Sequence, residues 1–168
     1  MRFAAVRPDV EELEQGAPTD VVVENARRKA RSGLEEANPG TVVLGADTEV
    51  VLEGRVLGKP GDEDEARALL EALSGRAHEV LTGVVLLGPR EAEAPERSGI
   101  ARSTVTFRDL DAATMELYLD SGEWRGRAGA YAIQGLGSIL IRQLEGDFSN
   151  VVGLPVPLLL DLAPELFE

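Results

Sequence analysis

The chain contains no cysteine and a single histidine, His78. These absences exclude disulfides, thiol catalysis, cysteine-based zinc sites and multi-histidine metal sites, so carboxylates are the only strong metal ligands left. No apolar run approaches the ~20 residues of a membrane span, and the opening MRFAAVRP is too short and too charged for a signal peptide. We therefore expect a cytoplasmic protein.

Positive charge is also scarce. Seventeen Lys and Arg oppose thirty Asp and Glu, and the net charge of −13 repels nucleic acid and anionic lipid. A phosphate-bearing ligand therefore requires a local positive pocket. Only Lys29 and Lys59 are lysines, in a chain that otherwise uses arginine. A planar guanidinium cannot replace a compact ammonium at every site, so both lysines are candidate functional residues, although Lys29 also fits a surface lysine at the border of a helix.

A length of 168 residues, with 43% hydrophobic and 28% charged residues, indicates one globular domain over residues 1–168. Strands alternate with helices, and residues 41–45 form an apolar run typical of a strand buried on both faces. We expect an α/β fold with a mixed, mostly parallel twisted sheet, flanking helices and one long antiparallel hairpin. The predicted helices cover residues 19–37, 62–74, 111–119 and 155–166. The predicted strands cover residues 2–6, 41–45, 49–52, 55–57, 77–87, 100–107 and 138–144, with a hairpin tip at 88–99.

Asp47 follows the predicted strand at 41–45. The carboxyl end of a parallel strand is where α/β sheets open a ligand crevice, so Asp47 could hold a metal or act as a general base. The alternative is a turn residue that bonds its own backbone. Lys59 follows across the predicted short hairpin, and a carboxylate with a lysine is the minimal set for a metal-bridged phosphate. The glycine-rich segments at 54–60 and 135–140 match neither a P-loop nor a dinucleotide fingerprint.

Six motifs in this order and spacing resemble the Maf family of nucleoside triphosphate pyrophosphatases. They are GADT at 45–48, LGKP at 57–60, LSGRAHEVLTG at 73–83, TFR at 106–108, AGAYAIQG at 128–135 and SNVVGLP at 149–155. The resemblance runs from about residue 8 to residue 160. GADT, the histidine of the third motif and the IQG triplet are similar to the branch that acts on dTTP and UTP.

The resemblance implies an elongated Maf/ITPase-like α/β fold with two lobes around a central cleft, and hydrolysis of a triphosphate to a monophosphate and pyrophosphate. It also implies a divalent cation, Mg²⁺ or Mn²⁺, and a homodimer. By position, Asp47 resembles the family's proton acceptor and Glu12 its second acidic residue, and the two are expected to bind the metal. Lys29 and Lys59 resemble its phosphate-binding lysines, and Thr48 and Gln134 its base-selectivity positions.

Three other side chains are expected to have smaller roles. We expect His78 to be a hydrogen-bonded structural histidine, and Arg76 and Arg127 to add positive charge to the cleft. Arg127 stands where the family often has lysine, a change that keeps charge but alters shape.

The family's chains open with a strand and a Ser-x-Ser-Pro-Arg-Arg loop, and nothing similar precedes Phe3. We therefore expect weakened catalysis by the chain as written. The alternative is a catalytically impaired homologue that binds a nucleotide or a protein partner in the regulation of septum formation.

Overall fold

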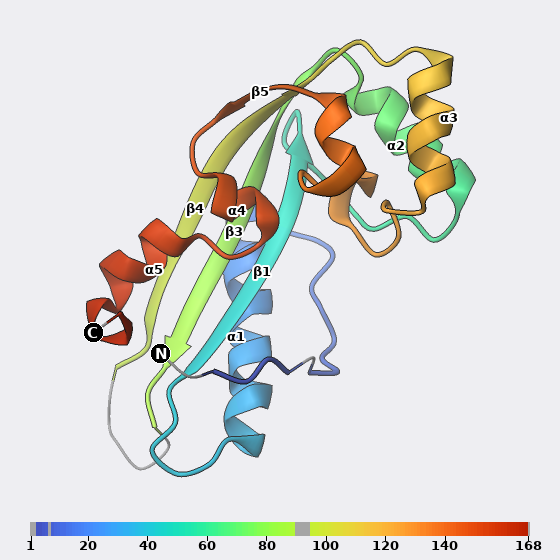
Figure 1. Ribbon diagram of the computed structural model, residues 1–168. Helices are drawn as coiled ribbons and strands as arrows, with labels where there is room; N and C mark the ends of the chain where they lie inside the picture. The colour runs from blue at the N-terminus through green and yellow to red at the C-terminus, as the bar shows by residue number, and fades with distance from the viewer. Residues whose placement is uncertain (1–2, 7, 90–94, 168) are drawn as a thin grey trace.

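One five-stranded sheet organises the computed structural model, which describes residues 3–6, 8–89 and 95–167. The strands are β1 (Val43–Leu52), β2 (Arg55–Leu57), β3 (Ala77–Leu87), β4 (Arg97–Phe107) and β5 (Ile141–Glu145). Their order across the sheet is β2-β1-β3-β4-β5, and every neighbouring pair is antiparallel (Figure 1).

The predicted mostly parallel sheet is therefore wrong. The prediction relied on the alternation of strands and helices, which is typical of crossover connections. Here α2 (Glu63–Leu73) lies beyond the end of the sheet where β1 finishes, and β3 starts from that same end and runs back beside β1 (Figure 1). Because α2 does not return the chain to the starting end of β1, the connection reverses the strand direction. The expected antiparallel pairing of residues 77–87 with residues 100–107 is confirmed.

Helices cover both faces of the sheet. The longest helix, α1 (Pro18–Glu36), packs on one face against β1 and β3. Two short helices, α4 (Phe148–Val152) and α5 (Val156–Leu162), pack against β3 and β4. They lie on the opposite face from α1 (Figure 1). Beyond one end of the sheet, α2 packs against α3 (Ala112–Ser121). Among the described helices, none combines the length and the apolar character needed to cross a membrane.

The largest apolar core lies at the α2 and α3 end of the molecule. Tyr118 from α3, Phe107 from β4 and Leu70 from α2 are completely or almost completely buried there, and Val50 of β1 belongs to the same cluster. Smaller clusters lie between the sheet and α1 on one face and between the sheet and α5 on the other. Apolar side chains therefore pack on both faces of the sheet, and the largest cluster lies beside the segments that follow β1.

Two glycines bring α1 unusually close to the sheet. A Cβ at Gly45 of β1 would overlap the carbonyl oxygen of Ala26, and one at Gly83 of β3 would overlap the carbonyl oxygen of Val22. Gly45 and Gly83 lie on neighbouring strands facing the same helix. This close approach lets side chains of α1 reach the residues of β1 that follow Gly45.

Several predicted element boundaries change. The strand expected at 41–45 continues to Leu52, so Asp47 lies inside β1 and not at its end. The strand expected at 138–144 becomes a 3-10 helix, η2 (Gly135–Leu140), followed by β5. The terminal helix divides into α5 and η3 (Pro164–Leu166). Residues 3–6 are not a strand, and residue 2 and the hairpin-tip residues 90–94 lie outside the described part of the chain.

Candidate active site

Asp47 is buried on the face of β1 that α1 covers, with 5% of its surface exposed. Lys29 of α1 donates a hydrogen bond from Nζ to Asp47 Oδ1 at 2.5 Å. Asn25, one helical turn earlier, donates from Nδ2 to Asp47 Oδ2 at 3.2 Å. Both contacts depend on the close packing at Gly45 and Gly83. The turn alternative for Asp47 is therefore wrong, since the side chain bonds to a helix distant in sequence.

A chain of alternating charges extends from Asp47 towards solvent. Lys29 Nζ also lies 2.6 Å from Glu12 Oε1, and Lys59 Nζ lies 3.4 Å from Glu12 Oε2. Burial lowers the pKa of Lys29, but its hydrogen bonds to Asp47 and Glu12 outweigh burial and raise the pKa above its usual value. Burial raises the pKa of Glu12, but the two lysines outweigh it and hold the pKa below its usual value. Lys29 and Glu12 therefore stabilise each other in their charged forms.

Asn25 fixes the loop that carries Glu12. Its Oδ1 accepts a hydrogen bond from the backbone N–H of Leu13 at 2.7 Å, and its Nδ2 donates to the Leu13 carbonyl oxygen at 3.1 Å. The Asn25 side chain is completely buried and also contacts Asp47. Asn25 was not among the residues predicted from the sequence. One usable signal was a lone amide on the apolar stripe of a helix, because a buried amide needs hydrogen-bond partners.

Glu49 is a second residue that the sequence analysis missed. It lies two positions after Asp47 on β1, so its side chain leaves the same face of the sheet. Burial raises its pKa to about 7, and the negative charges of Asp47 and Glu12 add to this effect while Lys59 opposes it. The Glu49 side chain forms no hydrogen bond or ion pair within the described part of the chain. The alternating pattern of an extended strand was the available signal.

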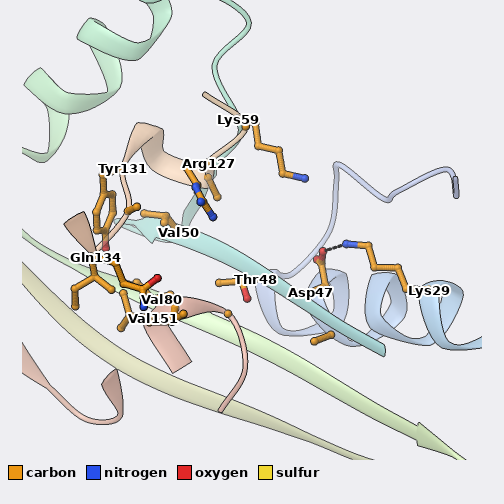
Figure 2. Close-up of a pocket in the computed structure, with 17 residues that line it drawn as sticks. Lys29, Asp47, Thr48, Val50, Lys59, Val80, Arg127, Tyr131, Gln134 and Val151 are labelled. Carbon is orange, nitrogen blue, oxygen red and sulfur yellow. Dashed lines mark hydrogen bonds and ion pairs between the residues drawn. The ribbon is translucent and has the colours of Figure 1, made fainter. Parts of the chain in front are cut away.

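Most of the predicted site residues line one cavity of about 230 Å³ (Figure 2). Its lining includes Lys29, Asp47, Thr48, Lys59 and Gln134. Glu12 is not part of the lining, but it holds both lysines through its ion pairs. The structure thus brings all six predicted residues into one connected arrangement, with Asp47 and Lys29 at one side of the cavity and Gln134 at the other (Figure 2).

The end of the cavity near Gln134 combines polar and apolar groups. Thr48 exchanges a hydrogen bond with Thr82 at 2.8 Å between the two Oγ1 atoms. Gln134 is exposed, and the loop after it is shaped by Glu123, whose carboxylate accepts hydrogen bonds from the backbone N–H groups of residues 136 and 137. Val50, Tyr131 and Val151 add apolar surface. Such a pocket fits a flat polar ring whose edge needs a donor and an acceptor.

His78 supports Tyr131 from behind the cavity. The distance between His78 Nε2 and the Tyr131 hydroxyl is 2.8 Å, and both rings meet Phe107 edge to face. His78 is 3% exposed, and burial lowers its pKa to about 4. The expectation of a hydrogen-bonded structural histidine is confirmed.

The two arginines expected to add charge to the cleft lie in different places. Arg127 lines the cavity, whereas Arg76 forms an ion pair with Glu53 at the turn between β1 and β2 and is not part of the lining.

Comparison with known proteins identifies the family of the chain. A family model described as "Maf-like protein" matches residues 1–166. The chain belongs to the Maf family. A protein of Xanthomonas euvesicatoria named dTTP/UTP pyrophosphatase is 47% identical over 159 residues, which cover 92% of this chain and 82% of the relative. A protein of the same name from Thermococcus gammatolerans is 42% identical over 166 residues, covering 99% and 86%.

In this member of the Maf family, Asp47 and Glu12 are the described carboxylates that could hold a cation shared with a ligand. Oxygens of both carboxylates converge on Lys29 Nζ, at 2.5 and 2.6 Å. Within the described ranges, no group of three or more Asp, Glu or His side chains could hold a metal by itself. Mg²⁺ commonly binds through one or two carboxylates and completes its coordination with substrate phosphates and water. Asp47 and Glu12 could supply these two carboxylates.

Proposed function

We propose that this chain is a nucleoside triphosphate pyrophosphatase that converts dTTP or UTP to the monophosphate and pyrophosphate. The observation that carries the proposal is the single cavity in which Asp47, two lysines and Gln134 meet. The names of the Maf relatives support an enzyme and the pyrimidine substrates. A family homodimer in the cytoplasm is part of the proposal, and light scattering of the purified chain would test the dimer.

We assign the role of proton acceptor to Asp47. Water attacks the α-phosphorus, its proton passes to the Asp47 carboxylate, and the bond to the bridging oxygen breaks so that pyrophosphate leaves with the electron pair. Lys29 and Lys59 neutralise the phosphate oxygens, and Lys29 also orients the Asp47 carboxylate. A divalent cation, Mg²⁺ or Mn²⁺, would be held by Asp47 and Glu12 and supplies charge withdrawal from the phosphates when bound.

We assign base selection to Gln134 and Thr48. The amide of Gln134 offers one donor and one acceptor, which is the pattern required by the imide edge of uracil or thymine. Substitution of Gln134 by Glu places a charge against the base carbonyls and should reduce the preference for pyrimidines. Unchanged ratios of kcat/KM across dTTP, UTP, dATP and dGTP would refute this role.

The decisive experiment measures pyrophosphate release from a nucleotide panel with Mg²⁺ and with Mn²⁺. We expect turnover of dTTP and UTP, and a loss of more than about 100-fold in Asp47→Asn, because an amide is neither a base nor a good metal ligand. Asp64→Asn, on the exposed surface of α2, is the matched control. Activity of Asp47→Asn within threefold of the parent, in a folded protein, would overturn the assignment.

A further inference from the structure

Three cations line the cavity, and they differ in how they are neutralised. Lys29 contacts the carboxylates of Asp47 and Glu12, and Lys59 contacts Glu12. Arg127 forms no ion pair with any described carboxylate, and its guanidinium lies within the cavity (Figure 2). Arg127 is therefore a cavity cation with no carboxylate partner among the described residues.

Arg127 is one of six described arginines without an ion pair, and what sets it apart is its place at the cavity wall. The other six described arginines form ion pairs with Asp or Glu side chains: Arg27, Arg28, Arg67, Arg76, Arg97 and Arg102. A net charge of −13 makes carboxylate partners abundant. An arginine that stays unpaired at the wall of a cavity is thus available for an anion that enters the cavity.

Backbone contacts place Arg127 beside Lys59. The 3-10 helix η1 (Ala128–Ala130) follows Arg127 directly, and the N–H of Gly129 donates to the carbonyl oxygen of Gly58 at 3.0 Å. Gly129 has φ +65°, and a Cβ there would lie 2.9 Å from Val50 Cγ1, so η1 is packed tightly on β1. Arg127 and Lys59 therefore belong to one wall whose two segments are joined by a hydrogen bond.

Arg127 lies away from Asp47 in the cavity, whereas Lys59 is linked to Asp47 through Glu12 and Lys29 (Figure 2). Figure 2 shows Lys59 and Arg127 on the loop side of the cavity and Asp47 on the strand side. Phosphoryl transfer proceeds with the attacking and leaving oxygens roughly in line. If Asp47 receives the proton of the attacking water, the leaving group departs on the side opposite Asp47. Arg127 is the described cation on that side, and Lys59 lies between Arg127 and the ion pair of Lys29 and Asp47 (Figure 2).

We propose that Arg127, together with Lys59, binds the departing pyrophosphate, which is the β- and γ-phosphate portion of the substrate. This inference rests on the proposed function and adds a binding residue to it. The guanidinium fork of Arg127 can donate two parallel hydrogen bonds to phosphate oxygens, whereas Lys59 supplies a point charge. Arg127 acts as a binding residue for the leaving group and makes no contact with the base.

The test compares binding of two products, inorganic pyrophosphate and dTMP, by isothermal titration calorimetry in buffer with magnesium chloride. Arg127→Ala should weaken binding of pyrophosphate by about 10- to 100-fold, the range expected for a charge-assisted contact, and should change binding of dTMP by less than threefold. Arg127→Lys should recover part of the loss, because charge returns without the fork. Arg142→Ala is the matched control, since Arg142 is exposed on β5, has no described ion pair and lies outside the cavity.

Pyrophosphate binding within threefold of the parent in Arg127→Ala would overturn the inference. Equal weakening of pyrophosphate and dTMP would also overturn it, as would a parent protein that does not bind pyrophosphate. If Arg127→Ala does not fold, as judged by circular dichroism, Arg127→Gln provides the same comparison. A parent that binds pyrophosphate through Arg127 but releases none from dTTP would refute the proposed function alone. If the parent releases pyrophosphate from dTTP but the Arg127 variants bind pyrophosphate as tightly as the parent, the inference alone is refuted.

Discussion

Glu49→Gln should change how the stability of the protein depends on pH. The pKa of Glu49 is raised from 4.5 to about 7, chiefly by burial. In the folded protein the carboxyl group keeps its proton up to about pH 7, whereas in the unfolded chain it loses the proton near pH 4.5. The folded state binds more protons between these values, so stability falls as pH rises through this window and the full cost applies above pH 7.

The magnitude follows from the shift. About 2.5 pKa units at 1.36 kcal/mol each give about 3 kcal/mol, and the partial exposure of Glu49 reduces the expected value to about 1–3 kcal/mol. Gln cannot ionise and does not incur this cost. The free energy of unfolding of Glu49→Gln should therefore exceed that of the parent by about 1–3 kcal/mol at pH 8, with a smaller difference at pH 5.5.

Urea denaturation at half-unit steps from pH 5.5 to 8.5, without metal or nucleotide, measures this difference. Glu36→Gln is the control, because Glu36 is exposed at the end of α1 and has no ion pair among the described residues. A difference between parent and Glu49→Gln that stays constant with pH would refute the reasoning. A growing difference of the same size in Glu36→Gln would show that the effect belongs to net charge and not to the site.

Three further results are expected. Lys29→Met leaves the buried carboxylate of Asp47 without its cation. The free energy of unfolding, measured in urea, should therefore fall by about 3–5 kcal/mol, and a loss below about 1 kcal/mol would contradict a stabilising ion pair. Lys59→Arg keeps the charge but should lower pyrophosphate release at least tenfold, because the planar fork cannot occupy the same point; an active variant would contradict the two-lysine argument. As pH falls from 6.5 to 4, His78 becomes protonated in the unfolded chain but stays neutral in the folded chain, which lowers the free energy of unfolding by about 3 kcal/mol. His78→Gln should remove this pH-dependent loss. An unchanged dependence of stability on pH between 6.5 and 4 would contradict the reasoning.

Features that depend on nearby residues were predictable from the sequence. The helix predicted at 62–74 is present as α2, and it begins with a cap in which the Asp62 carboxylate accepts a hydrogen bond from the N–H of Glu65. The alternation of residues 77–87 and 100–107 predicted two strands and their antiparallel pairing. The motifs also predicted the family, and five of the six contribute residues to the lining of one cavity. Caps, periodicity and short motifs act over a few residues, so one sequence is enough to read them.

The direction of the sheet and the pairing of charges were decided by tertiary structure. No local signal in residues 41–52 distinguishes a parallel strand from an antiparallel one, because the path of the chain through α2 sets the direction of β3. Asp47 meets Lys29 because two strands carry glycines where α1 crosses them, and Asn25 holds Glu12 beside that contact. The pKa of Glu49 likewise depends on burial and on charges from other segments. Burial and charge proximity are properties of the packed chain, since electrostatic and packing energies depend on distances in space that sequence separation does not give.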